Sequence, residues 1–240
     1  MKKNISALFA FALLVFSGCG RDNPIQGCPE SAVDLGIVMT RENGSSYKLY
    51  WAKSNLSDSG LCPHQEDYGD YYAWGETETR EQYFWKTYKW CNGRASKLTK
   101  YNTELSYGTV DNRTVLDPED DVAHIKLGGK WRMPTDAEWT ELRENCTWTR
   151  TTQNSVTGYK VTATNGNSIF LPGAGGWYGE ILSDEGCALY WSSSLDTDVP
   201  YSAWSICRGP SPDYFFGSDD VHRYSGLRYF GFSIRPVYEE

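Results

Sequence analysis

Two segments of this 240-residue chain alternate apolar and polar residues on either side of an Asn-Gly pair. The first runs from Val33 to Trp51 around Asn43-Gly44, and the second runs from Tyr159 to Leu171 around Asn165-Gly166. Alternation with a period of two is typical of a strand with one buried face, and Asn-Gly favours a tight turn between antiparallel strands. The sequence therefore predicts two β-hairpins, which limits the fold to classes that contain antiparallel sheet.

Two short helices are predicted between the hairpins. Asp117 offers an N-cap, Pro118 suits the first helical position, and Gly128 would end the first helix. Thr135 and Glu138 have the spacing of a capping box at the start of the second helix. Two main short helices among several β-hairpins and long loops predict an α+β domain. Three further short strands are expected at Leu189–Ser193, Ala203–Cys207 and Phe232–Val237.

The N-terminus has the pattern of a lipoprotein signal peptide. Lys2 and Lys3 give a positive start, residues 5–16 are uncharged and mostly apolar, and two small residues precede Cys19. This run is too short to span a bilayer, which needs about 20 apolar residues, but it suits a signal peptide. We therefore expect a signal peptide over residues 1–18, lipidation of Cys19, a tether over 19–30 and one domain over 31–240. An ordinary signal peptide with a chance cysteine is the alternative.

The chain that follows residue 18 is acidic, with 21 basic and 31 acidic residues and a formal charge of −10. An acidic surface argues against a nucleic-acid partner, because phosphate backbones are bound by Lys and Arg. It argues equally against docking on anionic lipid, so we expect contact with the membrane only through the lipid anchor. The expected location is the outer membrane of a bacterium, exposed on the cell surface.

Six further cysteines follow Cys19. An even number in an exported chain favours disulfides, and six cysteines allow 15 pairings among which the sequence does not choose. None belongs to a C-x-x-C pair, which argues against zinc ribbons and thioredoxin-type redox sites. Several free buried thiols are the alternative. The six are Cys28, Cys62, Cys91, Cys146, Cys187 and Cys207.

Five longer motifs follow one another along the chain. They are Val33–Gly36, Glu66–Glu76, Trp131–Thr135 with Glu138 and Trp139, Tyr190–Ser194, and Gly231–Val237. In this order they resemble the motifs of the major paralogous domain family of bacterial lipoproteins (FISUMP), and they cover nearly the whole mature chain. That family resembles the formylglycine-generating-enzyme branch of the C-type-lectin fold, which also includes the variable proteins of diversity-generating retroelements. The resemblance implies a C-type-lectin-like domain that is displayed on the cell surface.

The catalytic residues of that branch are not matched. Formylglycine-generating enzymes bind copper through a late cysteine pair, and Cys187 and Cys207 occupy that region here. The residues around Cys207 do not follow the enzyme pattern, so a disulfide is the simpler interpretation of the pair. His64, His124 and His222 are widely spaced and lack metal-ligand spacing.

Two acidic groups are also weak candidates for chemistry. Asp117, Glu119, Asp120 and Asp121 could chelate calcium, but acidic residues at a helix N-terminus are the preferred interpretation. A glycosidase pair would need two differently tuned carboxyl groups, and nothing around Glu76 and Glu78 predicts a raised pKa. We therefore expect no catalytic residue, no metal and no cofactor.

Aromatic residues are concentrated in the last quarter of the chain, with 12 in the 49 positions of residues 190–238, against 15% overall. Trp191, Trp204 and Phe232 lie on expected strands and are predicted to be core. The rings of Tyr201, Tyr214–Phe216 and Tyr224–Tyr229 lie on expected loops beside Asp and Arg, a composition that is typical of binding loops. The predicted ligand-binding residues are Tyr201, Tyr214, Phe215, Phe216, Asp219, Asp220, His222, Arg223, Tyr224, Arg228 and Tyr229.

The sequence as a whole favours a non-catalytic surface protein that binds an external protein or glycan through these loops. A structural or adhesive subunit of a surface assembly is one alternative. An oxidase of the formylglycine-generating type is the other.

Overall fold

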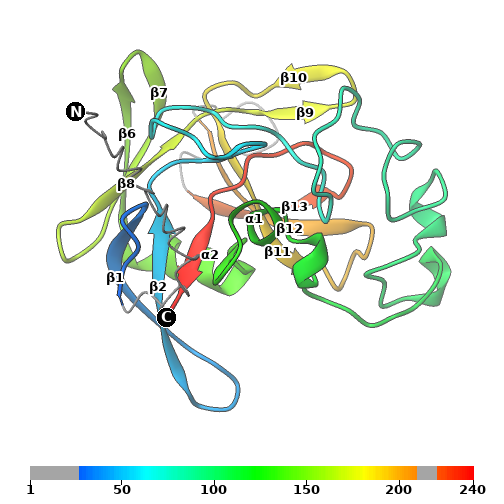
Figure 1. Ribbon diagram of the computed structural model, residues 1–240. Coiled ribbons are helices and arrows are strands. Elements are labelled where there is room, and N and C mark those ends of the chain that lie inside the picture. The colour runs from blue at the N-terminus through cyan, green and yellow to red at the C-terminus, as the bar shows by residue number, and fades with distance from the viewer. Residues whose placement is uncertain (1–26, 210–220) are drawn as a thin grey trace, which may run out of the picture.

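The computed structural model describes residues 27–209 and 221–240 (Figure 1). Strands make up 40% and helices 12% of the structure. The strands form one four-stranded sheet, two three-stranded sheets and two two-stranded sheets, all antiparallel. The protein is therefore mostly β, and the prediction of an α+β, C-type-lectin-like domain is wrong.

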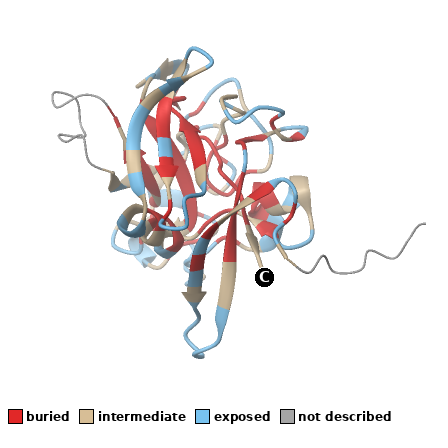
Figure 2. Cartoon of the chain, turned by 90° about the vertical axis from the view of Figure 1, so that its left-hand side faces the viewer, coloured by how far each residue is buried: buried red, intermediate tan, exposed pale blue. Residues whose placement is uncertain are grey.

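The four-stranded sheet brings the two ends of the folded chain together. The first predicted hairpin is confirmed, with Val33 opposite Trp51. The C-terminal strand pairs with the second strand of this hairpin, and the Gly27 amide donates to Glu240 Oε1 at 2.6 Å. The end of the predicted tether is thus part of the fold, whereas residues 40–46 at the tip of the hairpin are exposed (Figure 2). The sheet order is β1 (Ala32–Thr40), β2 (Ser46–Ala52), β14 (Val237–Glu239) and β5 (Trp131–Arg132).

A three-stranded sheet contains the second predicted hairpin, which is also confirmed. Val161 lies opposite Ile169, and both are buried because their face of the sheet packs on Trp51 and Trp139 in one apolar cluster. The rings of these two tryptophans lie 4.6 Å apart between centroids. The strands are β6 (Thr147–Gln153), β7 (Val156–Thr162) and β8 (Ser168–Pro172).

The other three-stranded sheet carries the main core. Trp191 and Phe232 are fully buried as predicted, with ring centroids 4.4 Å apart. The strand that was expected at residues 232–237 begins only at Val237, and Phe232 and Ser233 make isolated bridges instead. Residues 224–229 were expected to lie on a loop, but residues 222–227 form the edge strand of this sheet. The strands are β11 (Ala188–Leu195), β12 (Ser202–Arg208) and β13 (His222–Leu227).

The helical signals are correct locally but cover few residues. Thr135 and Glu138 form the predicted capping box at the start of α2 (Asp136–Asn145). The first helix, α1 (Val122–Leu127), is capped by Asp121 rather than by Asp117, and it ends after six residues at Gly128, whose φ is +69°. Asp117 instead precedes the short 3-10 turn η3 (Pro118–Asp120). Helices this short do not outweigh the hairpins, which explains the failure of the α+β prediction.

A long irregular segment over residues 62–117 runs along one side of the β11–β13 sheet (Figure 1). It lies next to the turn that follows β13, because the Trp74 amide donates to the Arg228 carbonyl. No described helix is long and apolar enough to cross a membrane. The remaining elements are β3 (Leu56–Ser57), β4 (Gly60–Leu61), the 3-10 turns η1 (Ala95–Lys97) and η2 (Leu105–Tyr107), β9 (Gly176–Tyr178) and β10 (Ile181–Ser183).

Candidate ligand-binding surface

The predicted ligand-binding residues do not lie together in the structure. Five of them, together with the predicted lipidation site Cys19, lie outside the described residues. The other six lie directly before β12, on β13 and in the turn that follows β13. The five outside the described residues are Tyr214, Phe215, Phe216, Asp219 and Asp220.

Arg223 lies on the face of the sheet that α2 covers. Its guanidinium contacts the carboxylate of Asp136 through both Nε and Nη2, each at 2.9 Å. The same group lies 3.1 Å from the ring centroid of Trp204. Trp204 is half-buried beneath it, so the prediction of a fully buried core residue was only partly correct. These contacts engage Arg223 at the start of α2, away from the other predicted residues.

Tyr224 and His222 belong to the edge strand rather than to an exposed loop. Both are half-buried, and Tyr224 packs against the main core, 6.4 Å from Phe232 between ring centroids. Burial, together with the nearby Cys207, raises the pKa of Tyr224 to about 12. In the β12–β13 register His222 lies opposite Cys207. The alternation of β13 therefore sends Arg223 and Tyr224 to opposite faces of the sheet, and the six residues do not form one continuous patch.

Arg228 is fully buried, so its prediction as a ligand-contacting residue is wrong. Its Nε donates to Tyr88 Oη at 2.8 Å, Nη1 donates to the carbonyls of Tyr101 and Pro200, and Nη2 donates to the carbonyl of Lys100, each at 3.0 Å. All four acceptors are neutral. A buried charge is tolerated when its donors are satisfied in this way, and Arg228 thus joins three separate loops to the end of β13.

Tyr201 and Tyr229 remain half-exposed, and they lie with rings from distant parts of the sequence. Tyr229 packs on Trp85 with centroids 4.9 Å apart, and Tyr201 packs on Tyr107 at 5.2 Å. The two pairs are neighbours, because the Arg228 amide donates to the Tyr201 carbonyl. All rest on the same buried cluster around Tyr83 and Tyr88. We call this set the aromatic surface: Phe84, Trp85, Tyr107, Trp177, Tyr201 and Tyr229.

The loops under the aromatic surface are held in fixed positions. Tyr101 has a φ of +58°, a left-handed conformation that is uncommon for a residue with a large side chain. The Asp111 carboxylate accepts the amides of Tyr101 and Asn102, each at 2.9 Å, while Arg228 binds the Tyr101 carbonyl. These contacts offset the strain in the backbone. They fix the loop that lies between the aromatic surface and the core.

The sequence prediction identified Tyr201 and Tyr229 and missed the other four residues of this surface. Phe84 and Trp85 belong to the stretch Tyr83–Trp90, which holds five aromatic residues in eight positions. That density is higher than the 12 in 49 positions of the C-terminal quarter, and it could have marked the stretch as a binding segment. The contact of Trp85 with Tyr229 joins residues more than 140 positions apart, and no local sequence pattern predicts such a contact.

The acidic group near η3 is neutralised by lysine. Lys100 Nζ lies 2.7 Å from Asp117 Oδ2, 2.5 Å from Asp120 Oδ2 and 3.6 Å from Glu119 Oε1. The ammonium group thus occupies the position where a cation would meet these three carboxylates. Burial pushes the pKa of Asp120 upward, but hydrogen bonds from Lys100 and Tyr101 outweigh it and hold the pKa below its usual value.

Glu76 and Glu78, the other acidic candidates, have different surroundings. Glu76 is buried, forms an ion pair with Arg80 and accepts the Lys89 amide at 2.6 Å. The side chain of Glu78 is 77% exposed and lies 3.6 Å from Lys126 Nζ. One carboxylate is structural and the other belongs to the surface, which is not the arrangement of a glycosidase pair.

All six described cysteines are free, and Cys62, Cys91, Cys187 and Cys207 are buried. Burial, together with nearby negative charge, raises the pKa of Cys187 to about 11, and it also raises the pKa of Cys207 above its ordinary value. A reactive or metal-binding cysteine needs a thiolate and therefore a lowered pKa. The environment of this pair is that of structural thiols in a core.

We expect a thiol assay in guanidinium chloride without reductant to detect all six of these cysteines. In the folded protein, Cys28 should react first, because it is exposed, whereas the buried Cys207 should react only on unfolding. A denatured count of four or fewer would show that disulfides form and would contradict this expectation. The same preparation treated with a reductant is the control.

Comparison with known proteins finds no matching family model, no matching curated protein and no matching solved structure.

Proposed function

We propose that this chain is a non-catalytic binding protein that holds an external ligand against the aromatic surface. One observation carries the proposal: half-exposed rings from four separate segments of the chain pack on one buried cluster, in which Tyr88 accepts a hydrogen bond from the buried Arg228. The segments contain Trp85, Tyr107, Tyr201 and Tyr229. An arrangement that uses a buried charge to position exposed rings supports a role in recognition rather than in core packing.

The physical advantage of such a surface is that ligand binding has a low entropic cost. Tyr and Trp side chains offer a large contact area with only two rotatable angles, and they dominate the binding energy of many interfaces. Loops fixed before binding lose little freedom when a ligand arrives. Contiguous exposed apolar area is also uncommon on monomeric proteins that do not use it.

Neutral oligosaccharides are the ligand class that this surface favours. The C–H faces of pyranose rings pack on aromatic rings, and their hydroxyl groups can bond to Tyr hydroxyls at the edge. The formal charge of the chain is −8, which disfavours nucleic acids and acidic polysaccharides. A protein partner that uses the same rings is the alternative outcome of the test below.

The test is a binding screen with neutral hexasaccharides of glucose, mannose and xylose. We expect at least one to bind saturably and to change the fluorescence of the protein, because Trp85 and Trp177 lie on the surface. Heat-unfolded protein should give no such response. If no hexasaccharide binds, but the wild type captures a cell-surface protein that the Tyr229→Ala variant does not capture, the ligand is a protein. Capture that survives this substitution would contradict the proposed surface.

We further propose that the chain is exported and lipid-anchored at Cys19 on the outer membrane. The support is the N-terminal sequence, together with the motifs that resemble FISUMP lipoproteins. Mass spectrometry of the mature protein should find an N-terminal cysteine with an attached diacylglyceryl group. A Cys19→Ala variant should be released from the membrane. A mature N-terminus elsewhere, or membrane retention of the variant, would contradict the anchor.

A further inference from the structure

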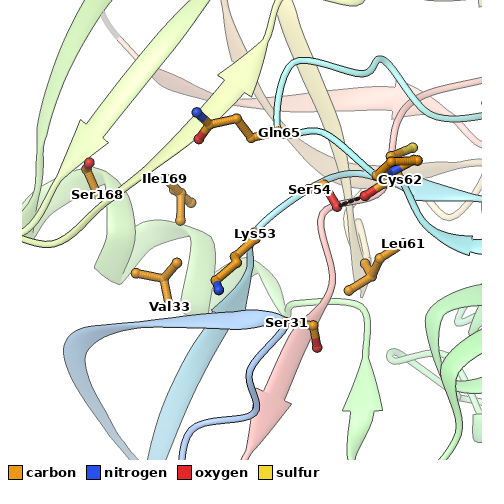
Figure 3. A pocket seen from close by; sticks show the side chains of 10 residues that line it. Ser31, Val33, Lys53, Ser54, Leu61, Cys62, Gln65, Ser168 and Ile169 are labelled. Atoms are coloured by element: carbon orange, nitrogen blue, oxygen red, sulfur yellow. Dashed lines mark hydrogen bonds between the residues drawn. The ribbon is translucent and has the colours of Figure 1, made fainter.

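A cavity of about 440 Å³ lies on another part of the molecule, where four chain segments meet (Figure 3). Ser31 and Val33 come from the start of β1, Lys53 follows β2, and the other walls come from residues 61–65 and from the start of β8. In Figure 3 the Lys53 side chain lies in the middle, with Val33, Ser168 and Ile169 to one side and Leu61 and Cys62 to the other. The cavity and the aromatic surface have no residue in common.

The walls of this cavity are held by hydrogen bonds. The Lys53 amide donates to the Ser31 carbonyl at 2.9 Å, and Ser54 Oγ donates to the Cys62 carbonyl at 2.6 Å. Behind them, the fully buried Arg235 donates to the carbonyls of Lys53 and Phe170 at 3.1 and 2.8 Å. A ligand would therefore meet a site that is already formed.

The charge in and behind the cavity is positive. Within the described residues, no carboxylate lies within ion-pair distance of Lys53 Nζ, and Arg235 also has only neutral hydrogen-bond acceptors. Asp67, whose charge reaches Cys62, accepts the His64 amide and does not line the cavity. Burial, followed by the effect of Asp67, raises the pKa of the Cys62 thiol, so this group adds no negative charge at neutral pH.

The remaining lining is amphipathic. Val33, Leu61 and Ile169 present apolar side chains, and Ile169 is almost fully buried. Ser31 and Ser168 contribute hydroxyl groups that make no hydrogen bond within the described part of the chain. An ammonium group and two free hydroxyls beside an apolar wall match a molecule with one anionic end and an apolar body.

We propose that this cavity binds a small organic monocarboxylate, with the carboxylate at Lys53 and the apolar body against Val33, Leu61 and Ile169. The whole chain is acidic, so attraction of the anion depends on the local charge of Lys53 and Arg235 rather than on the net charge. The proposal does not rest on the aromatic surface, and its test reports on different residues.

The probes are hexanoate and its neutral analogue hexanamide, added to ¹⁵N-labelled protein. We expect hexanoate to shift the amide resonances of residues at the cavity saturably, with a dissociation constant in the millimolar range, and hexanamide to bind at least fivefold more weakly. Lys53→Gln should weaken hexanoate binding at least fivefold. Lys97→Gln, which changes an exposed lysine on η1, should leave it unchanged.

Three results would overturn the proposal. They are the absence of saturable shifts at the cavity, equal binding of hexanoate and hexanamide, and equal binding by the wild type and Lys53→Gln. The spectra of Lys53→Gln without ligand show whether the variant is folded. If it is not, Lys53→Arg, which keeps the charge, should retain binding, and a loss of binding in folded Lys53→Arg would equally overturn the proposal.

Discussion

Replacing Arg228 with methionine should lower the free energy of unfolding by about 2–4 kcal/mol. The change leaves the carbonyls of Lys100, Tyr101 and Pro200 without their donor, and each unsatisfied buried acceptor costs about 1–3 kcal/mol. The loss is smaller than the sum of these costs, because the variant no longer buries a charge. Urea denaturation of the two proteins measures the difference.

Arg223→Met is the matched control for this prediction. Arg223 lies five positions earlier on β13 and is exposed, and its ion pair with Asp136 is at the surface. Exposed ion pairs contribute about 0–1 kcal/mol, so this variant should unfold close to the wild type. If Arg228→Met lowered the free energy of unfolding no more than Arg223→Met does, Arg228 would not hold the loops in place. The proposal of a preformed aromatic surface would then be contradicted.

Glu138→Ala should have an effect of similar size, about 2–4 kcal/mol, because it removes a buried carboxylate that accepts hydrogen bonds from three residues. Arg132 keeps its ion pair with Glu239, which limits the loss. Glu138 is fully buried and accepts two hydrogen bonds from Arg132, at 2.8 and 2.5 Å. It also accepts one from Tyr47 Oη and one from the Thr135 amide, which completes the capping box of α2. The substitution would therefore separate β5 and β2 from the start of the helix.

Glu144→Ala on the same helix is the control, since Glu144 is exposed and, among the described residues, pairs only with the adjacent Arg143. It should change stability by no more than about 0.5 kcal/mol. Thermal unfolding followed by circular dichroism compares the variants. If Glu138→Ala unfolded at the same temperature as the wild type, the pairing with Arg132 would contribute no net stability.

The parts of the fold that were predicted from the sequence are those with complete local signals. The Asn-Gly turns and the alternation around them specified both hairpins, and the capping box specified the start of α2. The prediction of the fold class failed because the residues that start a helix say little about its length: α1 ends after six residues at Gly128. The edge strand β13 was missed because its sequence, His222–Leu227, is mostly polar or small and lacks a clear apolar alternation.

The site was predicted only in part, for a related reason. Tyr201 and Tyr229 were identified by composition, and both lie on the aromatic surface. Arg228 has the same composition signal as an exposed binding arginine, and only long-range contacts reveal that its acceptors come from loops about 28 to 140 positions away. Trp85 lies outside the C-terminal quarter, so composition within that quarter excluded it.

The most direct test of the central claim is the affinity of the aromatic surface variants for the hexasaccharide that binds the wild type most tightly. Tyr201→Ala and Tyr229→Ala should each raise the dissociation constant at least about tenfold, which corresponds to about 1.4 kcal/mol. Tyr238→Ala removes a half-buried tyrosine with two ring neighbours on the four-stranded sheet, and it should leave the constant unchanged. Unchanged affinity in folded Tyr201→Ala and Tyr229→Ala would contradict the account, because the ligand would then bind elsewhere.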